Sequence, residues 1–346
     1  MKIDLNLDPV MLDNILEICN LRGNSHLSLT VLQGNVIIGA ISPEYLQVLH
    51  TGVKLEDVQD ISIRIPTRTI KPILSVGLIR FDIDQFLIMS RFYNGVVQSR
   101  VKIPLELDFN AGLIGEVVEA NKQHANDDKI SLAPLMQLRD LASISKQGVQ
   151  VEDKLAYISS EGYVVYKPVT FDQKFIVSKE CLGAILGFVR QTSQLIMFDV
   201  RGYHAVSRGF MIFCWRKTRQ YVNTDYDTFN SFIPQYSMSV NFINVKQIVK
   251  TIAPSKTQTY TAKFEFQNKY LQIGVGAHET FVATFSRDYL QDPEESDVLT
   301  VEIPYSVLRT ILLSNSFDWS NLIVSVYETC VAFQSNGITV VMIRGD

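Results

Sequence analysis

The sequence has no long apolar run, little cysteine and no net positive charge. Its 346 residues contain nothing close to the ~18 consecutive apolar residues of a membrane span. The N-terminus, Met1 to Leu7, alternates polar and apolar residues, unlike a signal peptide with a basic start and an apolar core. Four cysteines lie inside apolar runs without Cys-x-x-Cys spacing: Cys19, Cys181, Cys214 and Cys330. We therefore expect buried thiols in a reducing compartment and a cytoplasmic location, with no disulfide framework.

Motifs for catalysis and metal binding are also absent. The five histidines have no His or Cys partner at a metal-ligand spacing: His26, His50, His124, His204 and His278. No Gly-x-x-x-x-Gly-Lys or Gly-x-Gly-x-x-Gly loop occurs, and Ser207-Arg208-Gly209 is not a nucleophile elbow. We therefore expect a protein that is not an enzyme and that needs no cofactor or metal.

The net charge excludes one class of partner model. With 32 Lys and Arg against 36 Asp and Glu, the chain carries −4. A binder of nucleic acid with a uniformly basic surface is therefore excluded. Contact with nucleic acid would require basic residues to be segregated on one surface.

The sequence does contain an internal repeat, in which a pattern of strands and helices recurs more than the residues themselves. Its unit is an alternating strand, an amphipathic helix of about three turns, and two or three further strands. Six such units recur at an average spacing of about 59 residues. Their first strands end at Leu7, Ile65, Leu132, Val177, Phe242 and Ile303. This pattern predicts an α+β fold built from six βαβββ repeats.

Each alternating strand is followed by apolar residues at helical spacing. The stripes run over Leu12–Cys19, Ile70–Leu74, Leu135–Ala142, Leu182–Val189, Val245–Ile252 and Leu308–Leu312. In the second of these, Pro72 is tolerated only in a first turn, so this helix should start near Thr69 and be short, or it should kink. We also expect an extra helix over Gly112–Lys122, inside a connector that belongs to no repeat.

Two repeats make one domain of ordinary size, so six predict three domains. We place the first domain at residues 1–106, a connector at 107–129, the second domain at 130–219, a linker at 220–235 and the third domain at 236–346. The joints are the polar stretch Ala120–Lys129 and the loop Gln220–Gln235.

Positive charge is concentrated in the six expected helices. Over 9–22, 67–77, 132–147, 178–192, 243–256 and 304–315 the balance is +7, which leaves −11 for the rest of the chain. Lys246 and Lys250 lie one turn apart, opposite Val245, Ile248 and Val249. Lys and Arg are also ordinary helix-surface residues, which is the alternative for any one helix. The aggregate favours a surface that holds a polyanion.

Three segments resemble the bacterial sliding clamp family, the beta subunit of the replicative DNA polymerase III holoenzyme. Residues 149–152 with 155–165 are similar to a family strand pair, and Phe175–Lys179 is similar to the entry into a family helix. Residues 339–344, Thr-Val-Val-Met-Ile-Arg, are similar to the family's closing strand. Tyr163-Val164 replaces a His-Arg of the family, and the chain ends in Gly345-Asp346. A divergent clamp, for example from a bacteriophage, would fit these departures.

The resemblance implies a three-domain clamp in which two subunits close head to tail around duplex DNA, with helices lining the hole and sheets outside. Such a ring is a processivity factor: it holds DNA without reading its sequence and tethers DNA polymerase and the clamp loader through short peptide motifs. The basic residues expected at the phosphates are Arg68, Lys71, Arg139, Lys146, Lys179, Arg190, Lys246, Lys250 and Arg309.

The resemblance also implies an apolar pocket for partner peptides between the second and third domains. It would be formed by Tyr163, Val164, Val165, Tyr226, Val341, Met342 and Ile343. Val164, Val165 and Val341 also fit ordinary core strand positions. We expect Tyr163, Met342 and Ile343 to be exposed to the partner.

Two alternatives remain open at the level of sequence. One is a β-rich assembly protein, such as a viral structural subunit, whose repeats serve packing alone. The other keeps the clamp fold but uses it as a sliding transcription co-activator. The basic helices favour the DNA-binding readings over the structural subunit, which has no reason to collect positive charge there.

Overall fold

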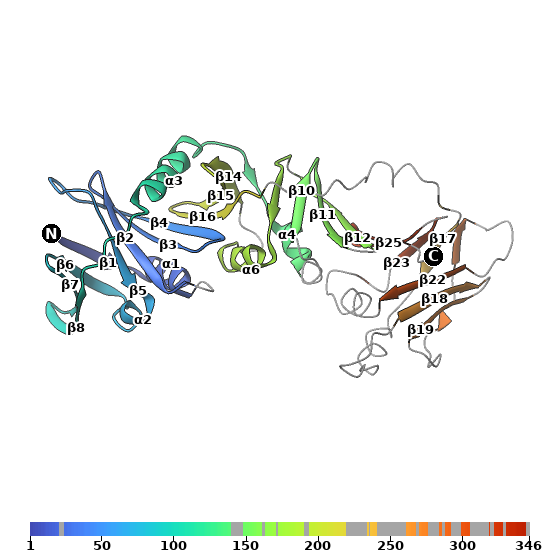
Figure 1. Cartoon of the computed structure of the whole chain (residues 1–346), viewed down its shortest axis with the longest axis horizontal. Coiled ribbons are helices and arrows are strands. Elements are labelled where there is room, and N and C mark those ends of the chain that lie inside the picture. The colour runs from blue at the N-terminus through green and yellow to red at the C-terminus, as the bar shows by residue number, and fades with distance from the viewer. Residues whose placement is uncertain are drawn as a thin grey trace. The chain divides into compact units, whose positions relative to one another are not determined.

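A computed structural model describes most of the first two thirds of the chain and selected strands of the rest. The described residues are 1–20, 24–139, 148–160, 163–170, 172–189, 194–218, 234, 236–240, 261–267, 270–275, 284–285, 288–291, 299–304, 318, 322–327 and 330–343. The structure is a sheet-rich α+β fold, as predicted (Figure 1). No helix among these residues is long and apolar enough to cross a membrane.

Contacts divide the chain into two compact units. The first holds Met1–Leu132 and Gly183–Lys217, and the second holds Ala133–Leu182 and Thr218–Asp346. The predicted second domain, 130–219, contributes to both units because its strands pair with strands from both ends of the chain. The units follow the large sheets, and the division into three domains remains a prediction.

The first unit contains two antiparallel sheets. The smaller has the order β1 (Lys2–Leu7), β6 (Gly77–Ile83), β7 (Phe86–Tyr93) and β8 (Val96–Pro104). The larger has the order β5 (Ile61–Pro66), β2 (His26–Leu32), β3 (Asn35–Ile41), β4 (Tyr45–Lys54), β16 (Met211–Arg216), β15 (Tyr203–Arg208), β14 (Leu195–Val200) and β9 (Lys129–Ile130). The larger sheet is made continuous by the pairing of β4 with β16, in which Leu46 is opposite Cys214.

The second unit also contains two sheets. Nine strands form the order β13 (Phe175–Val177), β10 (Val149–Glu152), β11 (Leu155–Ser160), β12 (Tyr163–Pro168), β25 (Ile338–Ile343), β24 (Cys330–Ser335), β23 (Leu322–Val326), β17 (Tyr236–Val240) and β21 (Asp288–Gln291). Four strands form the order β20 (Thr284–Phe285), β19 (Tyr270–Val275), β18 (Thr261–Gln267) and β22 (Leu299–Pro304). Here β12 pairs with β25, which joins the predicted second and third domains.

The described helices fit the predicted stripes. They are α1 (Pro9–Asn20), α2 (Thr67–Ile70), α3 (Ala111–Gln123), α4 (Ala133–Gln137) and α6 (Lys179–Phe188). The α2 helix is short, as Pro72 requires, and begins two residues before the expected start. The helices expected over 243–256 and 304–315 lie outside the described residues.

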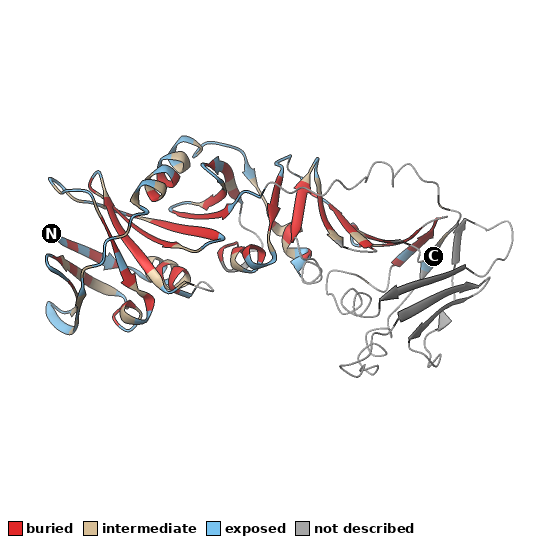
Figure 2. Cartoon of the chain, in the orientation of Figure 1, coloured by how far each residue is buried: buried red, intermediate tan, exposed pale blue. Residues whose placement is uncertain are grey.

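The two faces of the eight-stranded sheet are covered by different helices. The α3 helix buries Ile114, Val117 and Val118 against one face, where they meet Leu46 and Val48 of β4 and residues of β14 to β16. Gln47 alternates with Leu46 and Val48 along β4, and its Nε2 donates to the Glu17 carboxylate of α1 at 3.4 Å. The α1 helix therefore covers the opposite face. Figure 2 shows buried strands between these helices.

All four cysteines are free and buried, as predicted. Burial raises the pKa of the Cys19 thiol to about 11, which the nearby Lys71 ammonium partly opposes. Burial also raises the pKa of Cys214, which packs in the core beneath α3. Both thiols therefore stay protonated at neutral pH and act as apolar core groups.

Candidate functional site

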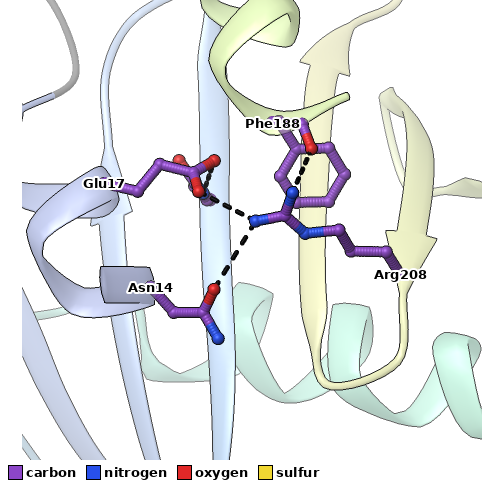
Figure 3. A network of polar contacts seen from close by, with 5 residues as sticks. Asn14, Glu17, Phe188 and Arg208 are labelled. Atoms are coloured by element: carbon purple, nitrogen blue, oxygen red, sulfur yellow. Dashed lines mark hydrogen bonds and ion pairs between the residues drawn. The ribbon is translucent and has the colours of Figure 1, made fainter. Parts of the chain in front are cut away.

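The α1 face of the eight-stranded sheet is organised around Arg208 of β15 (Figure 3). Its guanidinium donates to the Glu17 carboxylate at 2.8 Å and to the Phe188 carbonyl at the end of α6 at 2.6 Å. A third contact, at 3.5 Å, reaches Asn14 Oδ1, and the guanidinium carbon lies over the Phe188 ring, 4.9 Å from its centroid. A planar fork of five N–H donors suits this role, because it can bond several acceptors at once. Arg208 thus joins α1 and α6 on one face.

The predicted phosphate contacts are only partly within the described residues. Arg68 is exposed on α2, and Lys71 follows it at the C-cap of the same helix, half-buried. In the second unit, Arg139 and Lys179 are exposed, the latter as the first residue of α6. The other five predicted contacts lie outside the described residues: Lys146, Arg190, Lys246, Lys250 and Arg309. The structure thus brings Arg68 and Lys71 together, and the DNA contact itself stays a prediction.

The α1 helix supplies no positive charge to this face. Its residues, Pro9–Asn20, include Asp13 and Glu17 but no Lys or Arg. Glu17 is compensated by Arg208, with both side chains about one-fifth exposed. Any positive charge on the α1 face must therefore come from elements other than α1, among them α2.

Most residues of the predicted peptide pocket lie side by side on two central strands. Tyr163 of β12 is directly opposite Met342 of β25, and Val164 is opposite Val341. Ile343 ends β25, whereas Tyr226 lies outside the described residues. The pairing of β12 with β25 thus brings most of these residues together, and peptide binding by them stays a prediction.

The expected exposure of this pocket was wrong for two residues. Tyr163 and Met342 are 2% and 1% exposed. Both lie on central strands of a nine-stranded sheet, where neighbouring strands and packing shield side chains on either face. On the other face Val164 packs, half-buried, against a cluster that contains Tyr157, Tyr166, Tyr327, Cys330, Ala332 and Val341. Val165 is completely buried, as its alternative assignment to the core suggested.

One surface was not predicted from the sequence: the free edge of the four-stranded sheet of the first unit. Among the described residues, strand β8 pairs only with β7, so its outer N–H and C=O groups have no strand partner there. Val96 and Val97 on this strand are 61% and 47% exposed. Next to this edge, Arg91 Nε of β7 and the opposite Ser99 Oγ of β8 are buried without a hydrogen-bond partner among the described residues. Buried polar atoms normally have partners, so these two atoms are exceptions.

A polar cluster around the buried His204 lies in the eight-stranded sheet. His204 Nδ1 is 2.9 Å from Asp199 Oδ1, and Lys217 Nζ donates to Asp199 Oδ2 at 2.5 Å. Burial lowers the pKa of His204, although the Asp199 carboxylate opposes this shift. Burial would raise the pKa of Asp199, but hydrogen bonds from Lys217 and His204 outweigh it and lower that pKa. Across the described part of the chain, no group of three His, Cys, Asp or Glu side chains is placed to hold a metal ion.

Comparison with known proteins finds similarity at the level of structure alone. No protein-family model and no curated protein matches the sequence. Solved structures match over 100% of both chains. They include a putative DNA polymerase III beta subunit from Eubacterium rectale (TM-score 0.73, 8% identity) and the DNA polymerase III subunit beta from Pseudomonas aeruginosa (TM-score 0.71, 12% identity). A third is the Helicobacter pylori beta clamp bound to a DNA ligase peptide (TM-score 0.66, 12% identity). The chain therefore has the fold of the bacterial DNA sliding clamps.

Proposed function

We propose that this protein is a DNA sliding clamp: two copies close head to tail into a ring that encircles duplex DNA without sequence specificity. The ring acts as a processivity factor for a DNA polymerase, has no enzymatic activity and works in the cytoplasm. The observation that carries the proposal is the likeness to sliding clamps over the whole length of the chain. The similarity found in three sequence segments points the same way.

Ring closure is supported by the way repeats already join within the chain. In both internal seams the last strand of one repeat pairs antiparallel with the last strand of another: β4 with β16, and β12 with β25. Among the described residues, β8 in the first unit pairs only with β7, and β20 in the second unit pairs only with β19. Antiparallel pairing of β8 with β20 of a second copy would join the subunits as the internal seams join repeats, and would close a two-subunit ring of twelve repeats.

The β8 edge is basic. Residues 86–104 around β8 contain Arg91, Arg100 and Lys102 and no acidic residue. Head-to-head contact between two such edges would bring like charges together, so this charge favours the head-to-tail arrangement.

In the proposed ring, DNA is held on the sheet face that α1 and α6 cover, opposite to α3. In the first unit α1 and α6 share one sheet face, and Arg68 and Lys71 belong to the neighbouring α2. Phosphate contacts from such helices provide affinity without sequence information, and topological linkage provides processivity. Polymerase and clamp loader would bind through short peptides at the cluster around β12 and β25, in the way that a ligase peptide is bound by the Helicobacter pylori clamp.

Two experiments test the proposal. Retention on circular DNA that is lost when the DNA is linearised would support encirclement. Light scattering after size exclusion should give a dimer for the native chain and a monomer for Val97→Asp, which places an anion on the exposed β8 edge. Ile323→Asp is the matched control, because Ile323 is a similarly exposed apolar strand residue (37%) away from β8. Identical masses for the native chain and Val97→Asp would remove β8 from the interface.

A further inference from the structure

A cavity opens beside the start of α3 in the first unit. Its volume is about 430 Å³, and it lies between β2, the β3–β4 turn and the segment that leads into α3. Its polar lining includes His26, Ser28, Ser42, Arg64, Asp108 and Asn110. None of these residues belongs to the surfaces assigned above to DNA, to the peptide pocket or to ring closure.

The cavity is on the α3 side of the eight-stranded sheet. Ser28 is directly opposite both Gly39 and Arg64 in the sheet, so the three positions share one face. A Cβ atom at Gly39 would lie 3.3 Å from Ile114 Cδ1 of α3, which identifies that face. The α1 helix covers the opposite face.

Hydrogen-bond acceptors in the cavity are used internally. One oxygen of Asp108 accepts the Ser28 hydroxyl at 2.5 Å, and the other accepts the backbone and side-chain N–H groups of Asn110 at 3.2 and 2.7 Å. Ser42 Oγ donates to the Tyr45 carbonyl at 3.2 Å. These contacts leave the carboxylate of Asp108 well compensated.

The cavity also contains a hydrogen-bond donor that no described residue uses, the Arg64 guanidinium. Arg64 is exposed, and its side chain makes no ion pair or hydrogen bond with any described residue, although it lines the same cavity as Asp108. Its guanidinium therefore offers a fork of N–H groups to an incoming anion, and a planar carboxylate matches that fork with two parallel bonds.

The segment that leads into α3 is held in place by the sheet. Arg64 N donates to the Glu106 carbonyl, and Asp108 N donates to the Ser62 carbonyl, both at 2.8 Å, so the segment runs along β5 as an added short strand. Leu107 is opposite Ile63 in this pairing, on the sheet face away from Arg64. Phe109, between the cavity residues Asp108 and Asn110 in the sequence, is 95% exposed, and an apolar side chain with this exposure is typical of a surface that a partner covers.

We propose that this cavity binds an acidic side chain of a partner protein, as part of a short peptide whose neighbouring apolar residue packs on Phe109. The choice of a peptide over DNA phosphate rests on the proposed ring, in which DNA meets the α1 face. Carboxylate binding to Arg64 does not depend on ring formation and can be measured without DNA.

The test uses two labelled, amidated pentapeptides, Gly-Leu-Glu-Phe-Gly and Gly-Leu-Gln-Phe-Gly, titrated into the full-length chain. Backbone amide NMR should show the Glu peptide shifting signals of residues 24–28, 41–43 and 108–110. The Gln peptide and Arg64→Gln should each weaken binding by about tenfold, because each removes one charge of the pair. Arg64→Lys should keep part of the affinity, since the charge stays but the fork is lost.

Arg201→Gln is the matched control, since it removes an arginine whose side chain is 85% exposed from the segment between β14 and β15, and it should leave affinity unchanged. Equal binding of both peptides, full affinity of Arg64→Gln, or shifts confined to other residues would each overturn the proposal. Displacement of the Glu peptide by inorganic phosphate at lower concentrations than by acetate would overturn the carboxylate assignment in favour of a phosphoryl ligand. These results are independent of DNA retention, so the two proposals fail separately.

Discussion

Arg208 and Glu17 are 191 residues apart in the sequence and form an ion pair of 2.8 Å in the folded chain. The pair joins β15, which comes from the predicted second domain, to α1 of the predicted first domain. Because the same guanidinium also bonds the Phe188 carbonyl, one side chain ties three elements together. The contact stabilises the β4–β16 seam, which no local sequence signal marks.

The first prediction concerns this pair. Arg208→Ala leaves Glu17 and the Phe188 carbonyl partly buried without a donor, and should cost about 2–3 kcal/mol of unfolding free energy. For a unit of this size, the unfolding midpoint should fall by about 5–10 °C. Thermal circular dichroism measures this midpoint. The midpoint of Arg208→Lys should lie between those of Arg208→Ala and the native chain. A fall of under 1 °C for Arg208→Ala would show that the pair does not hold the seam.

Two glycines of α3 form a matched pair. A Cβ at Gly112 would meet nothing within 4 Å, whereas one at Gly115 would lie 2.4 Å from Leu32 Cδ2. Gly112→Ala should therefore stabilise the protein by about 0.5–1 kcal/mol through helix propensity alone. Gly115→Ala should lose that gain to the clash with Leu32, and should regain part of it in combination with Leu32→Val. Equal stabilisation by both single changes, measured by denaturant unfolding, would mean that α3 does not pack closely on β2.

The phosphate contacts can be tested with a pair of single-charge variants. Arg68→Gln removes a cation near the α1 face, and Lys122→Gln removes one from α3 on the opposite side. If DNA is held at the α1 face, Arg68→Gln should weaken binding and reduce the slope of log K against log salt by about 0.9, while Lys122→Gln should not. Fluorescence anisotropy at several salt concentrations measures both. A larger effect from Lys122→Gln would place the DNA on the α3 face and contradict the proposed arrangement.

For the helix expected over 243–256, Lys246→Glu with Lys250→Glu should weaken DNA binding and leave the dimer intact. These residues lie outside the described structure, so the prediction rests on the sequence. Binding assays and light scattering on the same sample separate the two effects. Unchanged DNA binding would remove this helix from the DNA-contacting surface.

Acid should destabilise the fold partly through His204 and Asp199. The folded-state pKa of His204 is lowered, so the unfolded chain binds its proton more readily, and this contribution to stability is lost as pH falls through about 6.5. Asp199 acts in the same direction at lower pH, since its pKa is also lowered. His204→Gln should therefore flatten the decline in melting temperature between pH 7 and about 5.5. If the melting temperature of His204→Gln declined as steeply as that of the native chain, groups other than His204 would cause the decline.

Local patterns predicted much of this fold, because a strand or helix buried on one face has apolar residues at a regular spacing in the sequence. The alternation Ile3, Leu5, Leu7 gave β1, and the helical stripe over Leu12–Cys19 gave α1. The extra helix expected over Gly112–Lys122 is confirmed as α3, Ala111–Gln123. These elements carry their signal within a dozen residues.

Other elements left no readable pattern. Strand β4 interrupts its apolar run with Gln47, which is fully buried because α1 brings Glu17 to it. Strand β8 is exposed on both faces over its first three residues, Val96–Gln98, and alternates only from Ser99 onward. An alternation this short did not indicate that β8 is a free edge. Arg64 was overlooked for the opposite reason: it occupies an ordinary polar position in the alternation of β5, and only the fold brings Asp108 to its cavity.

Encirclement of DNA is tested most directly by comparing circular and linear forms of one plasmid. The chain is diluted until it is monomeric, mixed with DNA and concentrated so that dimers can close around it, without any loader. Gel filtration in about 0.5 M salt then removes protein held by charge alone. A sliding ring predicts protein that co-elutes with the nicked circle and is lost after a restriction enzyme linearises that circle. Equal retention on both forms, or no retention on either, would contradict the account.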